Sequence, residues 1–526
     1  MSTAAIERYA LRSAPTVGPA VALAGLTTLL FVRLFPDVTG KPLHEDEAVA
    51  GLISARPLGD VLHTVVLDRG GAPLHFVLAH FALAVDSSPD ALRWLSVVFA
   101  LATVTLCYDL ARRLAGRFAG VTAAALAATS QLLTIYGTFG RMYSLFAFTS
   151  ALAADLFVRV LERPERRTAV AAAAAALLPL AVHPFGAFLF ASEAVVVAWV
   201  WRGRVLRAAV PVIGISLLAV PLLLADLRLT DRYAPEAGRD LPGGYWAGEA
   251  ALRALGGAAG GYSALLALFV LLAAVGVFAL ARRRPAFTVF ACIAVAASPV
   301  VLVVAGAVGE VSDRLSPRHL VFTLPLWITL VATGLTRLAA ALPARARIAP
   351  LVAVAVAAAF APSAISDPRT IPSGEQHAVA APAAWLRSHL SRGDVLYPYS
   401  PVFLASLPEA ADARGYPREE VALARAVRRT DGVPAVFVAL PLRETVTPAT
   451  VHALRRKGMD VQAFASWLIL EQRGPFPDGR TALTAAAEML HKTAPIVATA
   501  APSTHGYLNQ IHGAACAALK RLDARC

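Results

Sequence analysis

Long apolar runs separated by short charged clusters dominate the first 365 residues of the chain. A membrane-spanning helix needs about 17–25 mostly apolar residues. The stretch Leu74–Val85 is shorter and predicts a helix at the membrane interface. Runs of spanning length predict eleven crossings, at residues 17–35, 94–111, 118–137, 142–161, 169–182, 185–201, 205–225, 262–281, 286–307, 319–336 and 348–365.

The placement of arginines predicts the orientation of these crossings in the membrane. Basic clusters follow the second, fourth, sixth, eighth and tenth runs, and basic loops concentrate on the cytoplasmic side of a membrane. Eleven crossings from a cytoplasmic N-terminus place all five clusters there, whereas counting Leu74–Val85 as a crossing would place them all outside. The first run has no small-residue cleavage site after it, which predicts a retained helix rather than a removed signal.

Composition agrees with a multi-pass membrane protein. Of the 526 residues, 57% are hydrophobic and 16% charged, and the mean hydropathy is +0.61, whereas soluble chains carry about a quarter charged residues. The net charge of +13 does not indicate nucleic-acid binding, because the basic residues lie at the ends of apolar runs. Four cysteines without CxxC spacing exclude a thiolate metal cage.

The chain changes character after residue 365. Residues 366–526 contain no spanning run and mix strand-like with helical patterns, which predicts an α/β domain following a membrane domain at 1–365. Under the predicted topology this domain lies outside the cytoplasm. Cys516 and Cys526 could form a disulfide there or remain two free thiols, and the sequence leaves both open.

Acidic residues open the first predicted outer loop, residues 36–93. His44, Glu45, Asp46 and Glu47 are consecutive, and like charges at close range raise each other's pKa. A solvated loop is one interpretation. The position at the membrane face favours another, in which a carboxylate deprotonates an acceptor hydroxyl that attacks a lipid-linked sugar from behind.

A leaving phosphate would need positive charge. Arg141 lies at the outer start of the fourth crossing, and Arg314 and Arg318 lie at the outer start of the tenth. Arginine binds phosphate oxygens through its planar set of donors, although these residues could also be interface arginines. Tyr143 and His319 neighbour them, as candidate substrate contacts.

The remaining polar groups near apolar runs have several interpretations. His183, at an outer turn, is a candidate substrate contact or a capping histidine. Asp155 with Arg159, and Asp109 with the arginines that follow it, predict structural pairs within helices. Glu193 lies in mid-helix, where a carboxyl group is either functional or protonated and bonded to its helix.

Five motifs in order resemble bacterial members of the GT-C superfamily, relatives of protein O-mannosyltransferases and of lipid A sugar transferases. The resemblance covers roughly residues 40–340. The motifs are Asp46-Glu47-Ala48, Pro73-Leu74-His75-Phe76, Leu92-Arg93-Trp94-Leu95-Ser96, Arg141-Met142-Tyr143 and Pro317-Arg318-His319.

The resemblance implies roles for individual residues. Asp46 matches the family's catalytic carboxylate, and Glu47 matches the neighbour that orients the acceptor or helps to bind a cation. Arg141 and Arg318 match positions near the donor phosphate. The chain departs from the family where His75-Phe76 replaces Tyr-Tyr and where His319 replaces the Tyr after the arginine. Some relatives use a divalent metal, but no further ligand set for one is visible in the sequence.

The resemblance therefore implies an inverting glycosyltransferase in the plasma membrane. We expect a polyprenyl-phosphate donor, a monosaccharide such as mannose, and a glycan, lipid or protein acceptor outside the cytoplasm. Two alternatives stay open. A transporter or flippase of lipid-linked sugars would use the same arginines without chemistry, and an inactive relative would only bind partners.

Overall fold

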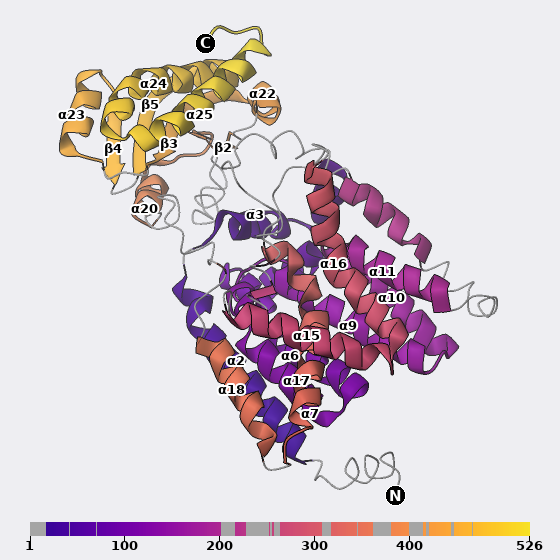
Figure 1. Cartoon of the computed structure of the whole chain (residues 1–526). Helices are drawn as coiled ribbons and strands as arrows, with labels where there is room; N and C mark the ends of the chain where they lie inside the picture. The colour runs from indigo at the N-terminus through magenta and orange to yellow at the C-terminus, as the bar shows by residue number, and fades with distance from the viewer. Residues whose placement is uncertain are drawn as a thin grey trace, which may run out of the picture. The chain divides into compact units, whose positions relative to one another are not determined.

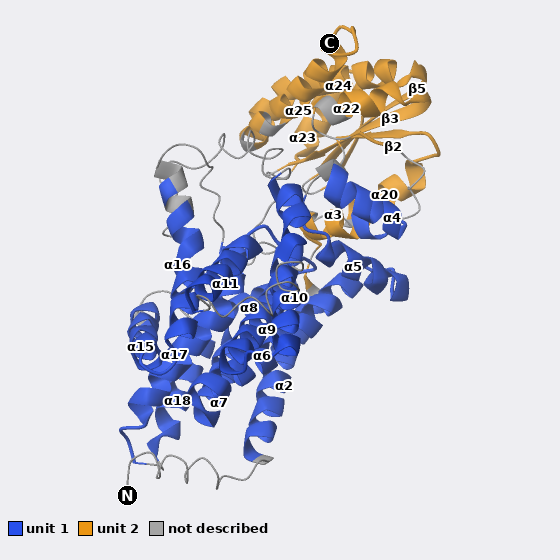
Figure 2. Ribbon diagram, turned by 90° about the vertical axis from the view of Figure 1, so that its right-hand side faces the viewer, with its two compact units in different colours: residues 1–40, 53–366 blue, residues 41–52, 367–526 orange. Residues whose placement is uncertain are grey.

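The chain forms two compact units. One contains residues 1–40 and 53–366, and the other contains residues 41–52 and 367–526 (Figure 2). The structure is a computed structural model, and it describes residues 17–41, 43–69, 71–200, 216–227, 252, 255–256, 264–307, 317–343, 346–360, 365, 380–398, 414–416, 420–442, 446–464 and 467–526.

The first unit is helical (Figure 1). Within the described residues, its elements are α2 (Val17–Gly40), α4 (Leu58–Leu62), the π-helix η1 (His63–Arg69), α5 (Leu74–Val85), α6 (Asp90–Ala115), α7 (Arg117–Thr129), α8 (Gln131–Tyr136), α9 (Tyr143–Glu162), α10 (Arg166–Val182), α11 (Gly186–Val200), α15 (Ala264–Ala281), α16 (Pro285–Ala307), the 3-10 helix η2 (Pro317–Thr323), α17 (Leu324–Ala339) and α18 (Ile348–Phe360).

Several predicted segments coincide with these helices. Four helical stretches in the described ranges are long and apolar enough to cross a membrane, at Gly18–Thr39, Asp90–Ala115, Tyr143–Glu162 and Pro317–Ala339. Shorter apolar helices correspond to other predicted runs, and the interfacial helix predicted at Leu74–Val85 is present as α5. Of the predicted run 205–225, only residues 216–225 lie within the described residues.

One predicted run is interrupted. The run 118–137 forms two helices, because Ser130 has an extended backbone and its hydroxyl accepts a hydrogen bond from the backbone of Leu133. This is the geometry of an N-cap, which starts a new helix. The predicted break after residue 182 is confirmed, since α10 ends at Val182 and α11 begins at Gly186.

The predicted ion pairs within helices are confirmed, and the structure extends them between helices. Asp155 pairs with Arg159 at 2.7 Å on α9, and Asp109 pairs with Arg112 and Arg113 on α6. Arg113 also reaches Asp155 Oδ1 at 3.0 Å, which joins α6 to α9. The three arginines and two aspartates thus form one ion-pair network at adjacent helix ends.

Two glycines bring α15 and α17 into direct backbone contact. A Cβ added at Gly334 would lie 1.8 Å from the carbonyl oxygen of Leu272, and one at Gly276 would lie 2.0 Å from that of Leu330. No side chain fits at either position, because the obstacle is backbone. Small residues allow this close approach between membrane helices.

We expect Gly334→Ala to destabilise the helical unit, because α15 and α17 would have to separate. Overpacking a tight interface costs about 1–3 kcal/mol. The measurement is thermal unfolding in detergent. Gly25→Ala on α2 is the matched control, since nothing lies within 4 Å of a Cβ there. Equal melting temperatures for the two variants would contradict the proposed backbone contact.

The second unit is a mixed α/β domain, as predicted for the end of the chain. Its strands form one five-stranded sheet in the order β2-β1-β3-β5-β4, with β1 parallel to β2 and β3 and the other pairs antiparallel. Its elements are α3 (Glu45–Ser54, of which residues up to 52 group here), α20 (Ala380–His389), β1 (Val395–Tyr397), β2 (Arg414–Gly415), α22 (Glu420–Arg428), β3 (Asp431–Pro441), α23 (Pro448–Arg456), β4 (Asp460–Phe464), β5 (Trp467–Asp478), α24 (Gly479–Ala500) and α25 (Pro502–Lys520).

Both faces of this sheet are buried. Successive residues of the central strand β3 alternate between two cores, so Val436 packs toward α24 and α25 whereas Phe437 packs toward α20. Ala48 of α3 belongs to the second core, which places this helix on the same face as α20. Residues 461–470, an apolar stretch that resembles a single strand in the sequence, instead belong to the antiparallel pair β4 and β5.

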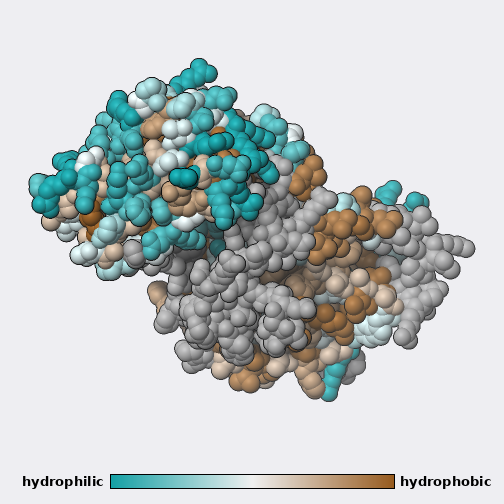
Figure 3. Space-filling view, turned by 90° about the horizontal axis from the view of Figure 1, so that it is seen from above, coloured by the Kyte–Doolittle hydropathy of each residue, from teal (hydrophilic) through white to brown (hydrophobic). Residues whose placement is uncertain are grey.

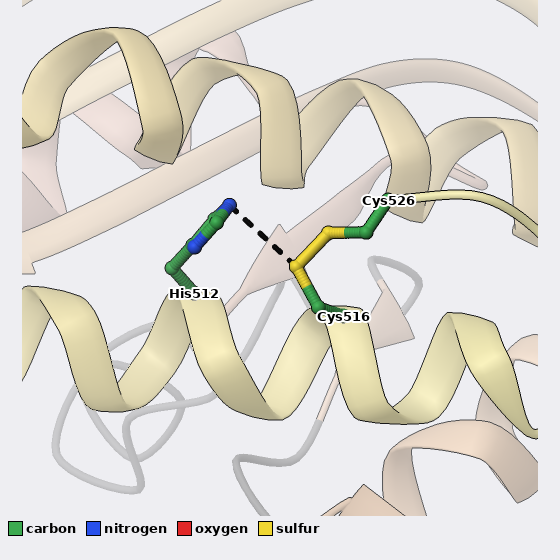
Figure 4. A group of neighbouring side chains, drawn as sticks. All are labelled: His512, Cys516 and Cys526. Atoms are coloured by element: carbon green, nitrogen blue, oxygen red, sulfur yellow. Dashed lines mark hydrogen bonds between the residues drawn. A yellow bond between two sulfur atoms is a disulfide. The ribbon is translucent and has the colours of Figure 1, made fainter.

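The two units differ in surface character. In the space-filling view, hydrophilic residues dominate the visible face of the C-terminal unit, and hydrophobic residues dominate the part of the helical unit that is both visible and described (Figure 3). The C-terminal unit also holds a disulfide between Cys516 and Cys526, which settles the alternative left open by the sequence (Figure 4).

Candidate functional site

Polar residues from three separate segments of the helical unit meet around His183. Arg141 and Tyr143 lie at the start of α9, His183 lies at the turn between α10 and α11, and Arg318 and His319 lie in η2. The ring centroids of His183 and His319 are 5.4 Å apart, and those of His183 and Tyr143 are 6.5 Å apart. Four of the residues predicted to bind substrate therefore surround a fifth.

The turn that carries Arg141 is fixed by hydroxyl groups. Ser96 on α6 donates a hydrogen bond to the carbonyl of Phe139 at 2.7 Å, and Ser144 donates one to the carbonyl of Tyr136 at 2.7 Å. Arg93, three residues before Ser96 in the same motif, instead donates to the carbonyl of Val38 at 2.9 Å and joins α6 to α2. The motif at residues 92–96 thus joins α6 both to α2 and to the turn before α9.

Aromatic rings line the site and position the arginines. The guanidinium carbon of Arg141 lies 6.0 Å from the ring centre of Phe76, and that of Arg318 lies 5.9 Å from the ring centre of Tyr143. His183 stacks on Phe146 at 5.1 Å. An aromatic face attracts a guanidinium, so these rings help to position both arginine side chains.

The two buried histidines are neutral. Burial and the charges of Arg318 and Arg141 lower the pKa of His183 to about 3. Burial and the charge of Arg141 lower the pKa of His75 to about 3. The positive charge of the site at neutral pH therefore comes from Arg141 and Arg318, and the imidazoles serve as neutral donors or acceptors.

His75 is a site residue that the sequence did not single out as such. It lies on α5 with only 2% of its surface exposed, and the protein provides no hydrogen-bond partner for its Nε2 among the described residues. A buried ring nitrogen without a protein partner suits a hydrogen bond to a ligand. The signal was present in the Pro73-Leu74-His75-Phe76 motif, where it stood as a departure from the family pattern.

The acidic segment lies on α3, which the structure groups with the C-terminal unit up to residue 52. Glu47 is buried, and its Oε2 accepts a hydrogen bond from the backbone of His44 at 2.9 Å. His44 Nδ1 in turn accepts one from the backbone of Asp46 at 3.0 Å. This reciprocal arrangement is a capping box, which starts the helix. The Asp46 side chain is 36% exposed.

Three further residues that the sequence analysis considered for function are Glu45, Arg314 and Glu193. Glu45 begins α3, and its side chain lies outside the described residues, as does the whole of Arg314. Glu193 is buried on α11 beside a mostly apolar cavity of about 280 Å³. None of the contacts described above joins Glu193 to the cluster around His183.

One group of side chains in the described ranges has the spacing of metal ligands: His512, Cys516 and Cys526. Cys516 and Cys526 form a disulfide, and His512 Nε2 lies 3.6 Å from Cys516 Sγ (Figure 4). A disulfide offers no thiolate to an ion. The described carboxylates of α3 do not form such a group, so we assign no chemical step to a metal.

We expect the thermal stability of the protein to fall as the pH falls below about 6.5, and His183→Phe to flatten that dependence. An unfolded histidine takes up a proton below its ordinary pKa near 6.5, whereas the folded His183, with its pKa of about 3, does not. The contribution of His183 to the free energy of unfolding is therefore fully present above pH 6.5 and is lost as the pH falls toward 3. Melting temperatures between pH 5 and 8 measure this. Identical slopes for both proteins would show that His183 is not held neutral.

Comparisons with known proteins show similarity in fold. No protein-family model and no curated protein matches the sequence. The structure of ArnT from Cupriavidus metallidurans bound to undecaprenyl phosphate superposes with a TM-score of 0.60 at 15% identity, covering 87% of this chain and 98% of that one. The apo form of ArnT gives 0.57 at 15% identity, covering 86% and 97%.

A third structure is less similar. The Archaeoglobus fulgidus oligosaccharyltransferase in complex with Zn and sulfate has a TM-score of 0.47 at 13% identity, covering 80% of this chain and 67% of that one. The two ArnT structures show that the chain has a GT-C-like fold over most of its length.

Proposed function

We propose that the protein is an inverting glycosyltransferase that takes a monosaccharide from a polyprenyl-phosphate carrier. The observation that carries this proposal is the pair of arginines around a neutral His183. Both guanidinium groups lie close enough to His183 to lower its pKa, and we infer that one phosphate group would bind between them. The fold that the chain shares with ArnT, which has been crystallised with undecaprenyl phosphate, supports the same ligand class.

The arginines would stabilise the leaving group. As the sugar–phosphate bond breaks, negative charge grows on the phosphate oxygens, and preorganised cations at that position lower the barrier. A guanidinium suits this role because it keeps its charge at any physiological pH and offers planar donors. The neutral His75 and His183 add hydrogen-bonding capacity without competing for the phosphate as extra cations.

Asp46 is our assignment for the general base. Its carboxylate would take the proton from the acceptor hydroxyl while the hydroxyl oxygen forms a bond to the anomeric carbon and the phosphate departs with the bonding electrons. This single displacement inverts the anomeric centre. The partial exposure of Asp46 supports access by an acceptor, whereas Glu47 is buried and engaged in the helix cap.

The topology belongs to the same proposal. We infer eleven crossings in the plasma membrane, a cytoplasmic N-terminus and an extracytoplasmic C-terminal unit. The disulfide in that unit supports this orientation, because disulfides persist in oxidising compartments. The acceptor would then be a glycan, lipid or protein outside the cytoplasm, and mannose is the first sugar to test.

We expect membranes containing the wild-type protein to transfer label from radioactive polyprenyl-phosphate mannose to an endogenous acceptor, and Asp46→Asn to abolish transfer while still binding the donor. Asparagine keeps the shape of the side chain but cannot take a proton. Equal transfer by both proteins would exclude Asp46 as the base. Donor binding without transfer by either protein, with several sugars offered, would favour a transporter or an inactive relative.

Glu47 offers a separate test, because glutamine can also close a capping box but cannot act as a base. We expect Glu47→Gln to keep most transfer activity, and Glu47→Ala to lower both activity and thermal stability. Loss of a cap costs about 0.5–2 kcal/mol. If Glu47→Gln is as inactive as Asp46→Asn while melting like wild type, Glu47 takes part in the chemistry and its structural role is secondary.

A further inference from the structure

A second arginine-lined cavity lies at the ends of three helices of the same unit. Its volume is about 270 Å³, and it is enclosed by the last turns of α6, α15 and α17 and the residues just after them. Arg282, Arg283 and Arg337 line it, and no aspartate or glutamate is among the lining residues. Three guanidinium groups around one cavity without an acidic residue in its lining favour an anionic ligand.

Arginines at the ends of neighbouring helices form ion pairs with carboxylates of the protein. Arg112 and Arg159 pair with the aspartates of α6 and α9, and Arg284 pairs with Glu162 at 3.0 Å. These residues are neutralised by carboxylates of the protein itself. In the described part of the chain, no ion pair joins Arg282 or Arg337 to a carboxylate, so these two lining residues differ from the arginines at the neighbouring helix ends.

The hydroxyl groups in the cavity restrict the ligand further. Thr333 donates to the carbonyl of Thr329 at 2.8 Å, and Thr336 donates to that of Ala332 at 2.7 Å. Their protons are therefore used within α17, and their oxygens remain able to accept a hydrogen bond. An anion that also carries hydroxyl groups would satisfy both the guanidiniums and these acceptors.

An apolar stripe leads to the cavity along α15. Leu271 and Phe278 are 65% and 62% exposed and lie seven residues apart, on one face of the helix. Arg282 lies over the Phe278 ring at 4.3 Å. The stripe can bind an acyl chain of the bilayer while its end presents positive charge, so the cavity suits a lipid better than a soluble anion.

We propose that this cavity binds an anionic glycerophospholipid with a hydroxyl-bearing headgroup, such as phosphatidylglycerol. The phosphate would lie among Arg282, Arg283 and Arg337, a headgroup hydroxyl would donate to Thr333 or Thr336, and an acyl chain would lie along Phe278. Basic cavities between membrane helices bind lipid headgroups in this way.

This site is distinct from the one that contains Arg318. Arg318 lies in η2, before the start of α17, and Arg337 lies in the last turn of the same helix. The 16 residues of α17 span about 24 Å. A lipid bound at one end of α17 therefore cannot be the phosphate ligand at the other.

The test is native mass spectrometry of the full-length protein in detergent, titrated with dioleoyl phosphatidylglycerol or with dioleoyl phosphatidylcholine. We compare wild type with R282Q/R283Q/R337Q. The matched control is R163Q/R166Q/R167Q, which removes the same charge from exposed positions around the α9–α10 turn. We expect wild type and control to bind phosphatidylglycerol about tenfold more tightly than the cavity variant, and all three to bind phosphatidylcholine weakly.

Three outcomes would overturn the proposal: equal phosphatidylglycerol affinity of the two triple variants, equal affinity of wild type for both lipids, or displacement of the lipid by millimolar glycerol phosphate or inorganic phosphate. The last would indicate a site for soluble anions. If the triple variant does not purify as a folded monodisperse protein, Arg337→Gln alone replaces it, and an unchanged affinity for phosphatidylglycerol would equally contradict the assignment.

Discussion

The site depends on keeping two positive charges inside a protein interior that disfavours charge. Arg141 is 8% exposed, and it shares its surroundings with His75 and His183, whose pKa values burial and the arginines lower to about 3. Histidines in this position lose their charge, whereas arginines keep theirs because their ordinary pKa is far above neutrality. The rings of Phe76 and Tyr143 lie beside the two guanidinium groups and help to position them.

The helical unit holds this arrangement through contacts made elsewhere. Hydroxyl groups of Ser96 and Ser144 fix the turn before α9, and the backbone contact at Gly276 and Gly334 fixes α17, which follows η2 directly. At the C-terminal end of α6, far along the chain from Ser96, an ion pair between Arg113 and Asp155 joins this helix to α9. Precise placement of a few donors on rigid helices is what electrostatic stabilisation of a leaving group requires.

Local sequence patterns were sufficient to predict several helix boundaries. Apolar length identified α5, and the His183-Pro184 break separated α10 from α11. Other features depend on contacts between distant segments. A single serine divided the run 118–137, and Ala48 attached α3 to the core beneath the C-terminal sheet. The burial of His75 beside Arg141 is another such contact, which no spacing within α5 could reveal.

The central claim is that Arg318 and Arg141 hold one lipid phosphate, and equilibrium binding of undecaprenyl phosphate to the protein in nanodiscs tests it most directly. Charge-assisted hydrogen bonds contribute about 1.5–3 kcal/mol, so Arg318→Gln should weaken binding at least about tenfold. Arg163→Gln, an exposed arginine after α9, should leave the affinity unchanged. Equal affinities for wild type and Arg318→Gln would contradict the assignment of the phosphate site.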